Sequence, residues 1–313
     1  MPMREMRAVI KQGRAVAVGR APVPVPGPGE LLIGVETAGV CRTDVYAARG
    51  MLACADPLVL GHEFAGHVVA RGQDVRRFAP GDRVAAMPVI PCGRCRRCAA
   101  GAPECCPHHE FLGIARHGAF AEYIAVPEQV VHPLPDRLSF REGAYAEPVC
   151  AALAVLKAAI RPDQRGLVYG DNRIAELTVR VLRAAGFNAV DTRATDSATP
   201  LERDAYDYAV ETLPTKEAFD ELIRAVRPGG RIVLKSRPPA PVALDLTAAL
   251  RKELVFEATA YATFAQSLAF LAEHEVSDLF GRTYPLERFA DAFDADGTGE
   301  QRKIFLSATR GVP

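Results

Sequence analysis

Four cysteines in one short segment constrain this chain more than any other feature. Cys92, Cys95, Cys98 and Cys106 have the spacing C-x2-C-x2-C-x7-C, in a stretch rich in Gly, Arg, Ala and Pro without hydrophobic periodicity. Such a segment cannot bury an apolar core of its own, but four thiolates can fold it around a tetrahedral zinc ion. A site with four protein ligands is closed to other molecules, so this zinc is predicted to be structural.

Two alternatives stay open for these cysteines. An iron–sulfur cluster also uses four cysteines and a C-x2-C-x2-C run, although nothing nearby suggests an electron-transfer partner. Cys105 adjoins Cys106 and could supply the fourth sulfur instead. Cys54 and Cys150 have no partner pattern, and we interpret them as packing residues.

Length and charge limit the class of protein. The 313 residues exceed what one hydrophobic core usually serves, which favours two domains. A formal charge of +0, with no basic stripe, argues against nucleic acid and membrane surfaces as partners. Arg4, Glu5 and Arg7 stand where a signal peptide needs an apolar core, and the apolar stretch 144–160 is too short to cross a bilayer. We therefore expect a cytoplasmic protein with reduced cysteines.

The first part of the chain has the pattern of a β domain. Short segments of strand-forming residues are separated by Gly, Pro and Asp signals, without helices between them, which favours a compact, partly closed β structure. The expected strands are 8–10, 15–18, 31–37, 63–70, 83–87 and 119–126.

After residues 132–136 strands alternate with helices, the pattern of a parallel, doubly wound sheet. A helix at 141–160 precedes a strand at 166–170, and Ile174, Leu177 and Val181 then lie on one helical stripe. Further strands are expected at 188–190, where Asp191 ends the strand, and at 206–211, 231–235 and 250–258, with helices at 216–226, 263–274 and 285–293 and a last strand at 303–306.

A second group of metal-ligand residue types lies early in the chain. The segments C-R-T-D at 41–44 and G-H-E at 61–63 bring together a thiol, a hydroxyl, an imidazole and two carboxylates, and Glu147 adds a third carboxylate in an apolar setting. Catalytic zinc sites use three protein ligands and an open position. We hypothesise a zinc held by Cys41, His62 and Glu147, with Glu63 beside it or bound to it.

The segment after the strand at 166–170 resembles a dinucleotide-binding loop in part. The fingerprint G-x-G-x-x-G/A needs its second glycine for close approach of the pyrophosphate. Gly170 and the final alanine are present, but Asn172 replaces the second glycine and Asp171 adds a negative charge. Arg173 could pair with a phosphate. Asp191 lies about 20 residues further on, where an acidic residue reads the ribose hydroxyls.

A second departure concerns the length of the sheet. Thirteen residues, 193–205, separate Thr192 from Tyr206, where a full doubly wound sheet has a helix, a third strand and another helix. At about 3.3 Å per residue this segment spans roughly 40 Å, enough to cross to the fourth strand but not to build the missing units. The third strand is therefore expected to be absent. Arg193 leaves a cofactor with a 2′-phosphate open, so NAD is only weakly preferred over NADP.

Taken together, these motifs resemble the zinc-containing medium-chain dehydrogenase/reductase family, which includes alcohol, sorbitol, threonine and glucose dehydrogenases. The resemblance covers nearly the whole chain and rests on motifs at 41–44, 61–63, 81–84, 92–106, 118–123, 147–148 and 227–231. It implies an α/β fold with a GroES-like β catalytic domain, residues 1–155 completed by 281–313. A truncated Rossmann-type sheet at 156–280, lacking its third-strand region, would form the cofactor domain.

The resemblance also implies roles for single residues. Cys41, His62 and Glu147 match the catalytic zinc ligands, and Glu63 matches a carboxylate that can enter or leave the coordination sphere. Thr43 matches the hydroxyl that relays the substrate proton, Asp44 the carboxylate that orients His62, and Tyr46 the outer end of the relay. The positions that match cofactor contacts are Arg42, Gly170, Asn172, Arg173 and Asp191.

The function that this resemblance implies is a zinc-dependent oxidoreductase. It would transfer hydride between a polyol, sugar or other secondary alcohol and NAD or NADP, with one catalytic and one structural zinc, as a homodimer or homotetramer. The altered phosphate loop keeps a second hypothesis open, a zinc-dependent lyase or isomerase on the same fold with impaired or lost dinucleotide binding.

Overall fold

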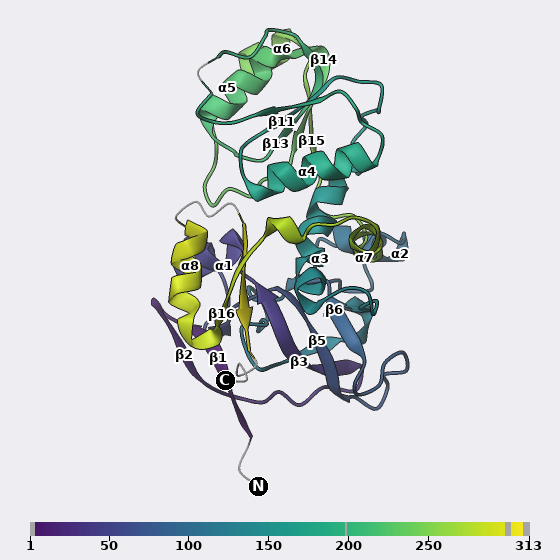
Figure 1. Cartoon of the computed structure of the whole chain (residues 1–313), viewed down its shortest axis with the longest axis vertical. Helices are drawn as coiled ribbons and strands as arrows, with labels where there is room; N and C mark the ends of the chain where they lie inside the picture. Colours follow the sequence, from purple (N-terminus) through teal and green to yellow (C-terminus); the bar gives the residue numbers. More distant parts are fainter. Residues whose placement is uncertain (1–3, 198, 298–301, 309–313) are drawn as a thin grey trace. The chain divides into compact units, whose positions relative to one another are not determined.

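The computed structural model describes residues 4–197, 199–297 and 302–308. The chain forms two compact units (Figure 1): unit 1 comprises Met1–Glu147 and Thr263–Pro313, and unit 2 comprises Pro148–Ala262. Unit 2 is therefore inserted into unit 1, and it lies earlier along the chain than the predicted cofactor domain, 156–280. None of the helices in the described residues is both long and apolar enough for a membrane span.

A seven-stranded sheet dominates unit 1. Its order is β10-β6-β5-β3-β17-β16, and β9 also pairs with β3. The long central strand β3 buries Leu31, Ile33 and Val35, because these β-branched and aliphatic side chains suit a pleated core face. The strands are β3 (Glu30–Gly39), β5 (Glu63–Arg71), β6 (Arg83–Ala86), β9 (Tyr123–Pro127), β10 (Val131–Pro133), β16 (Phe280–Pro285) and β17 (Lys303–Ser307).

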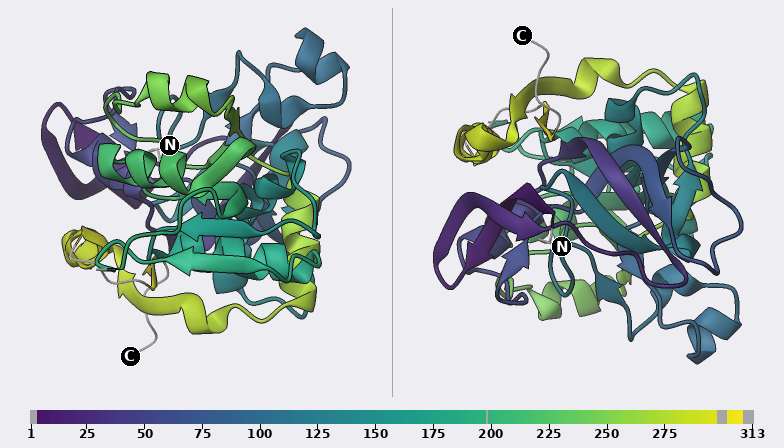
Figure 2. Two further views of the ribbon diagram at one scale, coloured as in Figure 1. Left: turned by 90° about the horizontal axis from the view of Figure 1, so that it is seen from above. Right: turned by 90° about the horizontal axis from the view of Figure 1, so that it is seen from below.

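Smaller elements surround this sheet. The hairpin β1 (Glu5–Gln12) and β2 (Ala15–Pro22), purple in Figure 2 (right), turns at Gly13, whose φ of +58° favours glycine. The other elements of unit 1 are β4 (Leu58–Val59), β7 (Val89–Ile90), β8 (Glu110–Phe111), α1 (Arg42–Ala48), α2 (Arg96–Ala99), α7 (Phe264–Glu273), α8 (Phe289–Gly297) and the 3₁₀ turns Pro103–Cys105, Glu128–Val130, Ser277–Leu279 and Leu286–Arg288. Helix α3 (Phe140–Leu153) begins in unit 1 and continues into unit 2.

Unit 2 contains a five-stranded parallel sheet with the order β12-β11-β13-β14-β15. The order reverses at β11, so the helix that follows β11 and the helix that follows β13 cover opposite faces. The strands are β11 (Gly166–Tyr169), β12 (Val190–Arg193), β13 (Tyr206–Glu211), β14 (Val226–Leu234) and β15 (Val255–Ala258), and the helices are α4 (Arg173–Ala184), α5 (Lys216–Ala225) and α6 (Leu246–Arg251), with a 3₁₀ turn at Ala154–Lys157.

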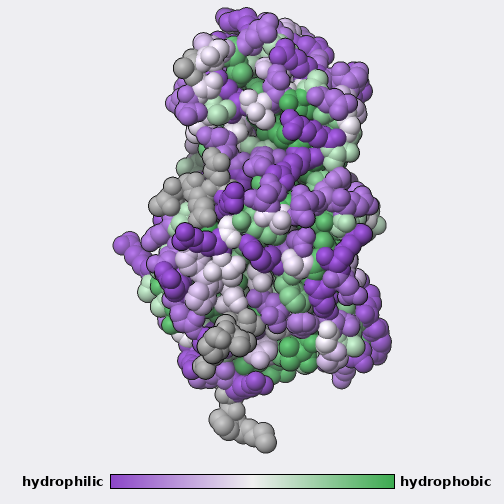
Figure 3. Space-filling view, viewed as in Figure 1, coloured by the Kyte–Doolittle hydropathy of each residue, from purple (hydrophilic) through white to green (hydrophobic). Residues whose placement is uncertain are grey.

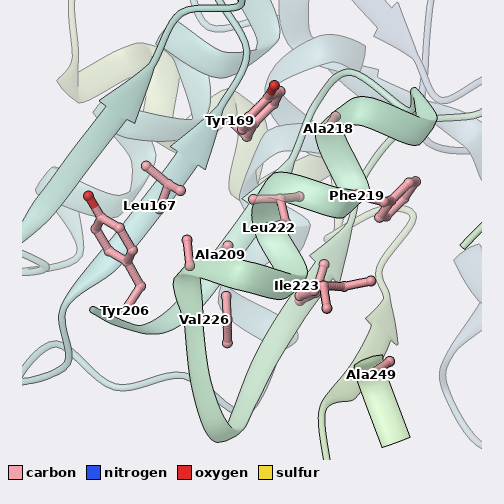
Figure 4. Packing of buried hydrophobic residues seen from close by; sticks show 12 residues of the cluster. Leu167, Tyr169, Tyr206, Ala209, Ala218, Phe219, Leu222, Ile223, Val226 and Ala249 are labelled. Carbon is pink, nitrogen blue, oxygen red and sulfur yellow. The ribbon is translucent and has the colours of Figure 1, made fainter. Parts of the chain in front are cut away.

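The truncation of this sheet is confirmed. Among the described residues between β12 and β13, the chain forms turns and extended segments without a strand or helix, so β12 is an edge strand. Leu222 and Ile223 of α5 pack in one buried cluster with Leu167, Ala209 and Val226 of the strands (Figure 4). The face of the molecule seen in Figure 3 is mainly hydrophilic, with hydrophobic residues in small patches.

Several element boundaries differ from the sequence prediction. The strand expected at 250–258 starts at Val255, because Asp245 caps the N–H of Ala248 and opens helix α6. The strand expected at 188–190 runs from Val190 to Arg193, so Asp191 lies inside it rather than at its end. The strand expected at 119–126 starts at Tyr123, since the N–H groups of Ala119 and Phe120 bond to the carbonyls of residues 61 and 60 instead of to a neighbouring strand of the sheet.

Candidate active site

The metal-ligand side chains of Cys41, His62 and Glu63 lie where β3 ends and β5 begins. Cys41 is the N-cap of α1, directly after β3, and Glu63 opens β5 opposite Gly39 of β3. This pairing brings together residues distant in sequence. The ligand atoms of Cys41, His62 and Glu63 all lie within 4.8 Å of one another, and His62 and Glu63 are buried.

Asp44 holds two of these residues in place. Its Oδ1 lies 2.9 Å from Nδ1 of His62, and its Oδ2 accepts the backbone N–H of Cys41 at 3.0 Å. Burial lowers the pKa of His62, but the charge and hydrogen bond of Asp44 outweigh burial and raise the pKa well above its ordinary value. Because Nδ1 is occupied by Asp44, Nε2 is the nitrogen available to a metal.

Lys303 neutralises Glu63 inside the protein. Both side chains are 1% exposed, and Lys303 Nζ forms an ion pair with Glu63 Oε2. The contact lacks the angles of a directed hydrogen bond, whereas Nζ donates to the carbonyl oxygen of Val40 at 2.7 Å. A Cβ on Gly39 would approach Glu63 Oε2 to 2.3 Å, so glycine is needed beside the pair. Lys303 is not among the residues predicted from the sequence, although a lysine at the start of an apolar strand is a signal that could have indicated it.

Glu147 adjoins this group but is not part of it. Glu147 is buried on α3, 5% exposed. Burial is the main cause that raises the pKa of Glu63; Lys303 opposes the shift and Glu147 adds to it. Among the described residues, the compact set of ligand atoms contains Glu63 and not Glu147, so Glu147 as a zinc ligand stays a prediction.

The remaining predicted residues of this region surround Cys41. Thr43 is half-buried, and its Oγ1 lies 3.7 Å from Cys41 Sγ. Tyr46 is half-buried on the same helix, and Arg42 is exposed. The ring of Phe111 lies 5.2 Å from the ring of His62 and covers one side of it.

The donor atoms of Cys41, His62 and Glu63 fit zinc. A thiolate, an imidazole nitrogen and a carboxylate oxygen are the ligands zinc prefers, and three protein ligands leave a position for substrate. The orienting hydrogen bond that Nδ1–H of His62 donates to Asp44 is the outer interaction that metal-bound histidines ordinarily have.

The four cysteines of the lobe also converge. Their sulfurs lie within 4.8 Å of one another, with Cys95 Sγ 3.5 Å from Cys98 Sγ and 3.7 Å from Cys106 Sγ. Zinc–sulfur bonds of about 2.3 Å in a tetrahedron place sulfurs about 3.8 Å apart, so the geometry favours one zinc over an iron–sulfur cluster. In the described structure the group contains Cys106 and not Cys105.

The thiols of the lobe differ in pKa. Backbone N–H groups, first that of Arg94, lower the pKa of Cys92 to about 6, and burial raises the pKa of Cys98 to about 12. A cation bound among the four sulfurs favours the thiolate form of all of them.

The predicted cofactor residues lie in unit 2, apart from Arg42. Gly170 follows β11 with a φ of +127°, which favours glycine. Asn172 caps α4, and the half-buried Arg173 is the first residue of that helix. Asp191 pairs with Leu167 inside the sheet, and its carboxylate binds Arg165 at 2.9 Å and the hydroxyl of Tyr206 at 3.1 Å.

The structure therefore does not bring Asp191 to the carboxyl end of β12, where a ribose would lie. Arg193 holds that position, but its guanidinium is buried and bonded to Glu221 and to the carbonyl oxygen of Thr199.

Comparisons with known proteins match both parts of the chain to zinc-type dehydrogenases. Residues 27–136 match the alcohol dehydrogenase GroES-like domain, and residues 186–302 match the zinc-binding dehydrogenase domain. A sorbitol dehydrogenase of Halalkalibacterium halodurans is 31% identical over 79% of this chain and 75% of its own length. An L-threonine 3-dehydrogenase of Aeromonas hydrophila is 27% identical over 96% of this chain and 99% of its own.

A solved structure extends this likeness. A putative zinc-binding dehydrogenase from Sinorhizobium meliloti 1021, bound to NADP, superposes with a TM-score of 0.88 at 27% identity, and covers 97% of this chain and 99% of its own.

Proposed function

The chain belongs to the zinc-containing medium-chain dehydrogenase/reductase family, and we propose that its substrate is a polyol, a sugar or another secondary alcohol with a further hydroxyl group. Members of this family are zinc-dependent, NAD(P)-linked oxidoreductases of alcohol dehydrogenase type. The observation that carries this proposal is a pair of buried carboxyl groups. Glu63 lies with Cys41 and His62, and Glu147 is close enough to raise the pKa of Glu63 through its charge.

Two buried acids suit a substrate with more than one donor. Glu63 has Lys303 as its counter-ion, and Glu147 raises the pKa of Glu63, so the two acids share one small, desolvated region. An alkyl chain placed there supplies no donor to the carboxyl oxygens, and Glu63 Oε2 in particular makes no directed hydrogen bond among the described residues, which is costly in a buried site. A second hydroxyl group can donate to them, and sites built this way reject analogues that lack the group.

The proposed roles of the chain's own residues follow from their positions. Cys41, His62 and Glu63, with Glu147 adjacent, would hold the zinc, which when bound would supply a Lewis acid that polarises the alcohol oxygen. Asp44 fixes the backbone at Cys41 and the ring of His62.

Thr43 is the proposed first acceptor of the substrate proton. Its hydroxyl lies beside Cys41 Sγ, and Tyr46 follows one helical turn further on as the outlet towards solvent. Phe111 packs on His62 and keeps water from that side of the ring. The nicotinamide would supply the hydride acceptor. We further propose that the enzyme is cytoplasmic and forms a homodimer or homotetramer. Sedimentation of the purified protein tests the oligomeric state.

The test uses the zinc-loaded protein with sorbitol, L-threonine and 2-propanol, each with NAD and NADP. We expect kcat/KM for a polyol to exceed that for 2-propanol by roughly a hundredfold or more. Equal values for both would contradict the proposed substrate class. Product analysis by NMR separates the alternatives, because a dehydrogenase forms a carbonyl product and reduced cofactor in equal amounts, whereas a lyase or isomerase forms product without cofactor reduction.

A variant pair tests the proton path. Thr43→Val should lower kcat strongly at unchanged zinc content, and Thr43→Ser should restore it. Thr37→Val, on β3, removes a comparable buried hydroxyl outside the site and should leave kcat unchanged.

A further inference from the structure

Asn172 replaces the second glycine of the phosphate loop, and its side-chain amide has all of its hydrogen-bonding positions occupied by the protein. Asn172 Oδ1 accepts the backbone N–H groups of Ile174 at 3.0 Å and Ala175 at 3.1 Å. Its Nδ2 donates to the carbonyl oxygen and to Oγ1 of Thr212 at 3.0 and 3.1 Å. An amide has two donor hydrogens and an oxygen with two lone pairs, so none is left for a ligand.

This amide lies at the ligand-binding edge of the sheet. Gly170 and Thr212 directly follow β11 and β13, neighbouring strands at the point where the strand order reverses. Open parallel sheets bind ligands outside the carboxyl ends of the strands at such a point. A phosphate there normally accepts hydrogen bonds from the first N–H groups of the following helix. In α4, two of those N–H groups already bond to Asn172.

Thr212 holds the amide from the other side. Its hydroxyl donates to the carbonyl oxygen of Tyr169 at 2.8 Å, and its backbone N–H donates to the same oxygen at 3.1 Å. A Cβ on Gly170 would lie 2.3 Å from Thr212 Oγ1 and 3.1 Å from Asn172 Nδ2, so the two loops pack closely around the amide. A phosphate cannot accept hydrogen bonds from the N–H groups of Ile174 and Ala175 unless Asn172 moves.

The charge on the loop adds to this obstruction. Asp171 is exposed, and its carboxylate accepts a hydrogen bond from the hydroxyl of Thr195 at 3.2 Å. A carboxylate on the phosphate loop repels an approaching diphosphate. The second loop position therefore does not fit the usual contact between a dinucleotide and the helix N-terminus.

We propose that Asn172 is an internal substitute for the cofactor's phosphate, and that this residue sets a weak affinity of the enzyme for NAD(P). The inference rests on the proposed function, because it takes the nicotinamide dinucleotide as the ligand of unit 2. Binding requires either that Asn172 swings out and gives up four hydrogen bonds, or that the diphosphate stays farther from the helix.

The experiment measures dissociation constants of NADH and NADPH by nicotinamide fluorescence and calorimetry on the full-length, zinc-loaded protein. Asn172→Gly frees the two N–H groups, and glycine is tolerated at an N-cap. We expect this variant to bind at least one cofactor about tenfold more tightly, a difference of about 1.4 kcal/mol. Asn172→Asp keeps a capping oxygen and adds a charge, so it should bind no more tightly than wild type.

A cap removed elsewhere serves as the control. Asp245→Gly deletes the cap of α6, where Asp245 Oδ1 accepts the N–H of Ala248 at 2.9 Å, and should lower stability with unchanged dissociation constants. Saturable binding by wild type with equal or weaker binding by Asn172→Gly would overturn the inference and leave the proposed function intact. No saturable binding by either protein at millimolar cofactor would overturn both.

Discussion

Replacing Lys303 by methionine should destabilise the protein more than the loss of an ordinary ion pair would. Lys303 and Glu63 are each 1% exposed, so the variant leaves a carboxyl group buried without its counter-ion, and the carbonyl of Val40 loses a donor. Breaking one side of a buried pair costs about 3–5 kcal/mol. Unit charges about 3 Å apart attract by about 5 kcal/mol at an effective dielectric constant near 20, which agrees in size.

The assay is guanidinium denaturation of the zinc-loaded protein, followed by circular dichroism. The double variant Lys303→Met/Glu63→Gln removes both charges, so it should recover most of the stability that Lys303→Met loses. Glu63→Gln alone completes the cycle. The reasoning fails if Lys303→Met loses less than about 1 kcal/mol, the usual limit for an exposed pair, or if the double variant is no more stable than the single one.

Three further predictions concern other parts of the molecule. Cys98→Ser should reduce zinc from two ions per chain to one and lower the melting temperature, whereas Cys41→Ser should lose one zinc and activity at nearly unchanged melting temperature; elemental analysis and calorimetry check both. Burial raises the pKa of Glu122, but the hydrogen bonds from Arg7 outweigh it and lower the pKa. Glu122→Gln should therefore cost about 1 kcal/mol at neutral pH, and urea titrations should show this difference vanish as the pH falls through the pKa of the folded state. Leu222→Ala, at a fully buried position on the sheet-facing side of α5, should cost about 2–5 kcal/mol in the same titrations.

Local patterns were the part of the site that the sequence could predict. The cysteines of the lobe lie within fifteen positions, 92–106, and their spacing limits how they can surround an ion. Cys41 and Asp44 belong to one short helix, so their proximity also follows from sequence spacing. The sheet truncation was predictable because too few residues connect Thr192 to Tyr206.

Long-range contacts were not predictable in the same way. Lys303 reaches Glu63 because β17 pairs with β3, and nothing in the local sequence of either residue specifies that register. The choice between Glu63 and Glu147 as the nearest carboxylate depends on where α3 packs. The role predicted for Asp191 assumed that β12 ends there; the strand continues to Arg193, and two residues along a strand move a side chain by about 7 Å.

The insertion of unit 2 into unit 1 sets an order of events during synthesis on the ribosome. Unit 2 is one continuous stretch, so it can complete its sheet while β16 and β17 of unit 1 are still unmade. Until β17 emerges, the end of β3 at Ala38 and Gly39 lacks its partner on that side, and Glu63 has no lysine to neutralise it. The metal pocket therefore gains the lysine that neutralises Glu63 only when the chain after unit 2 arrives.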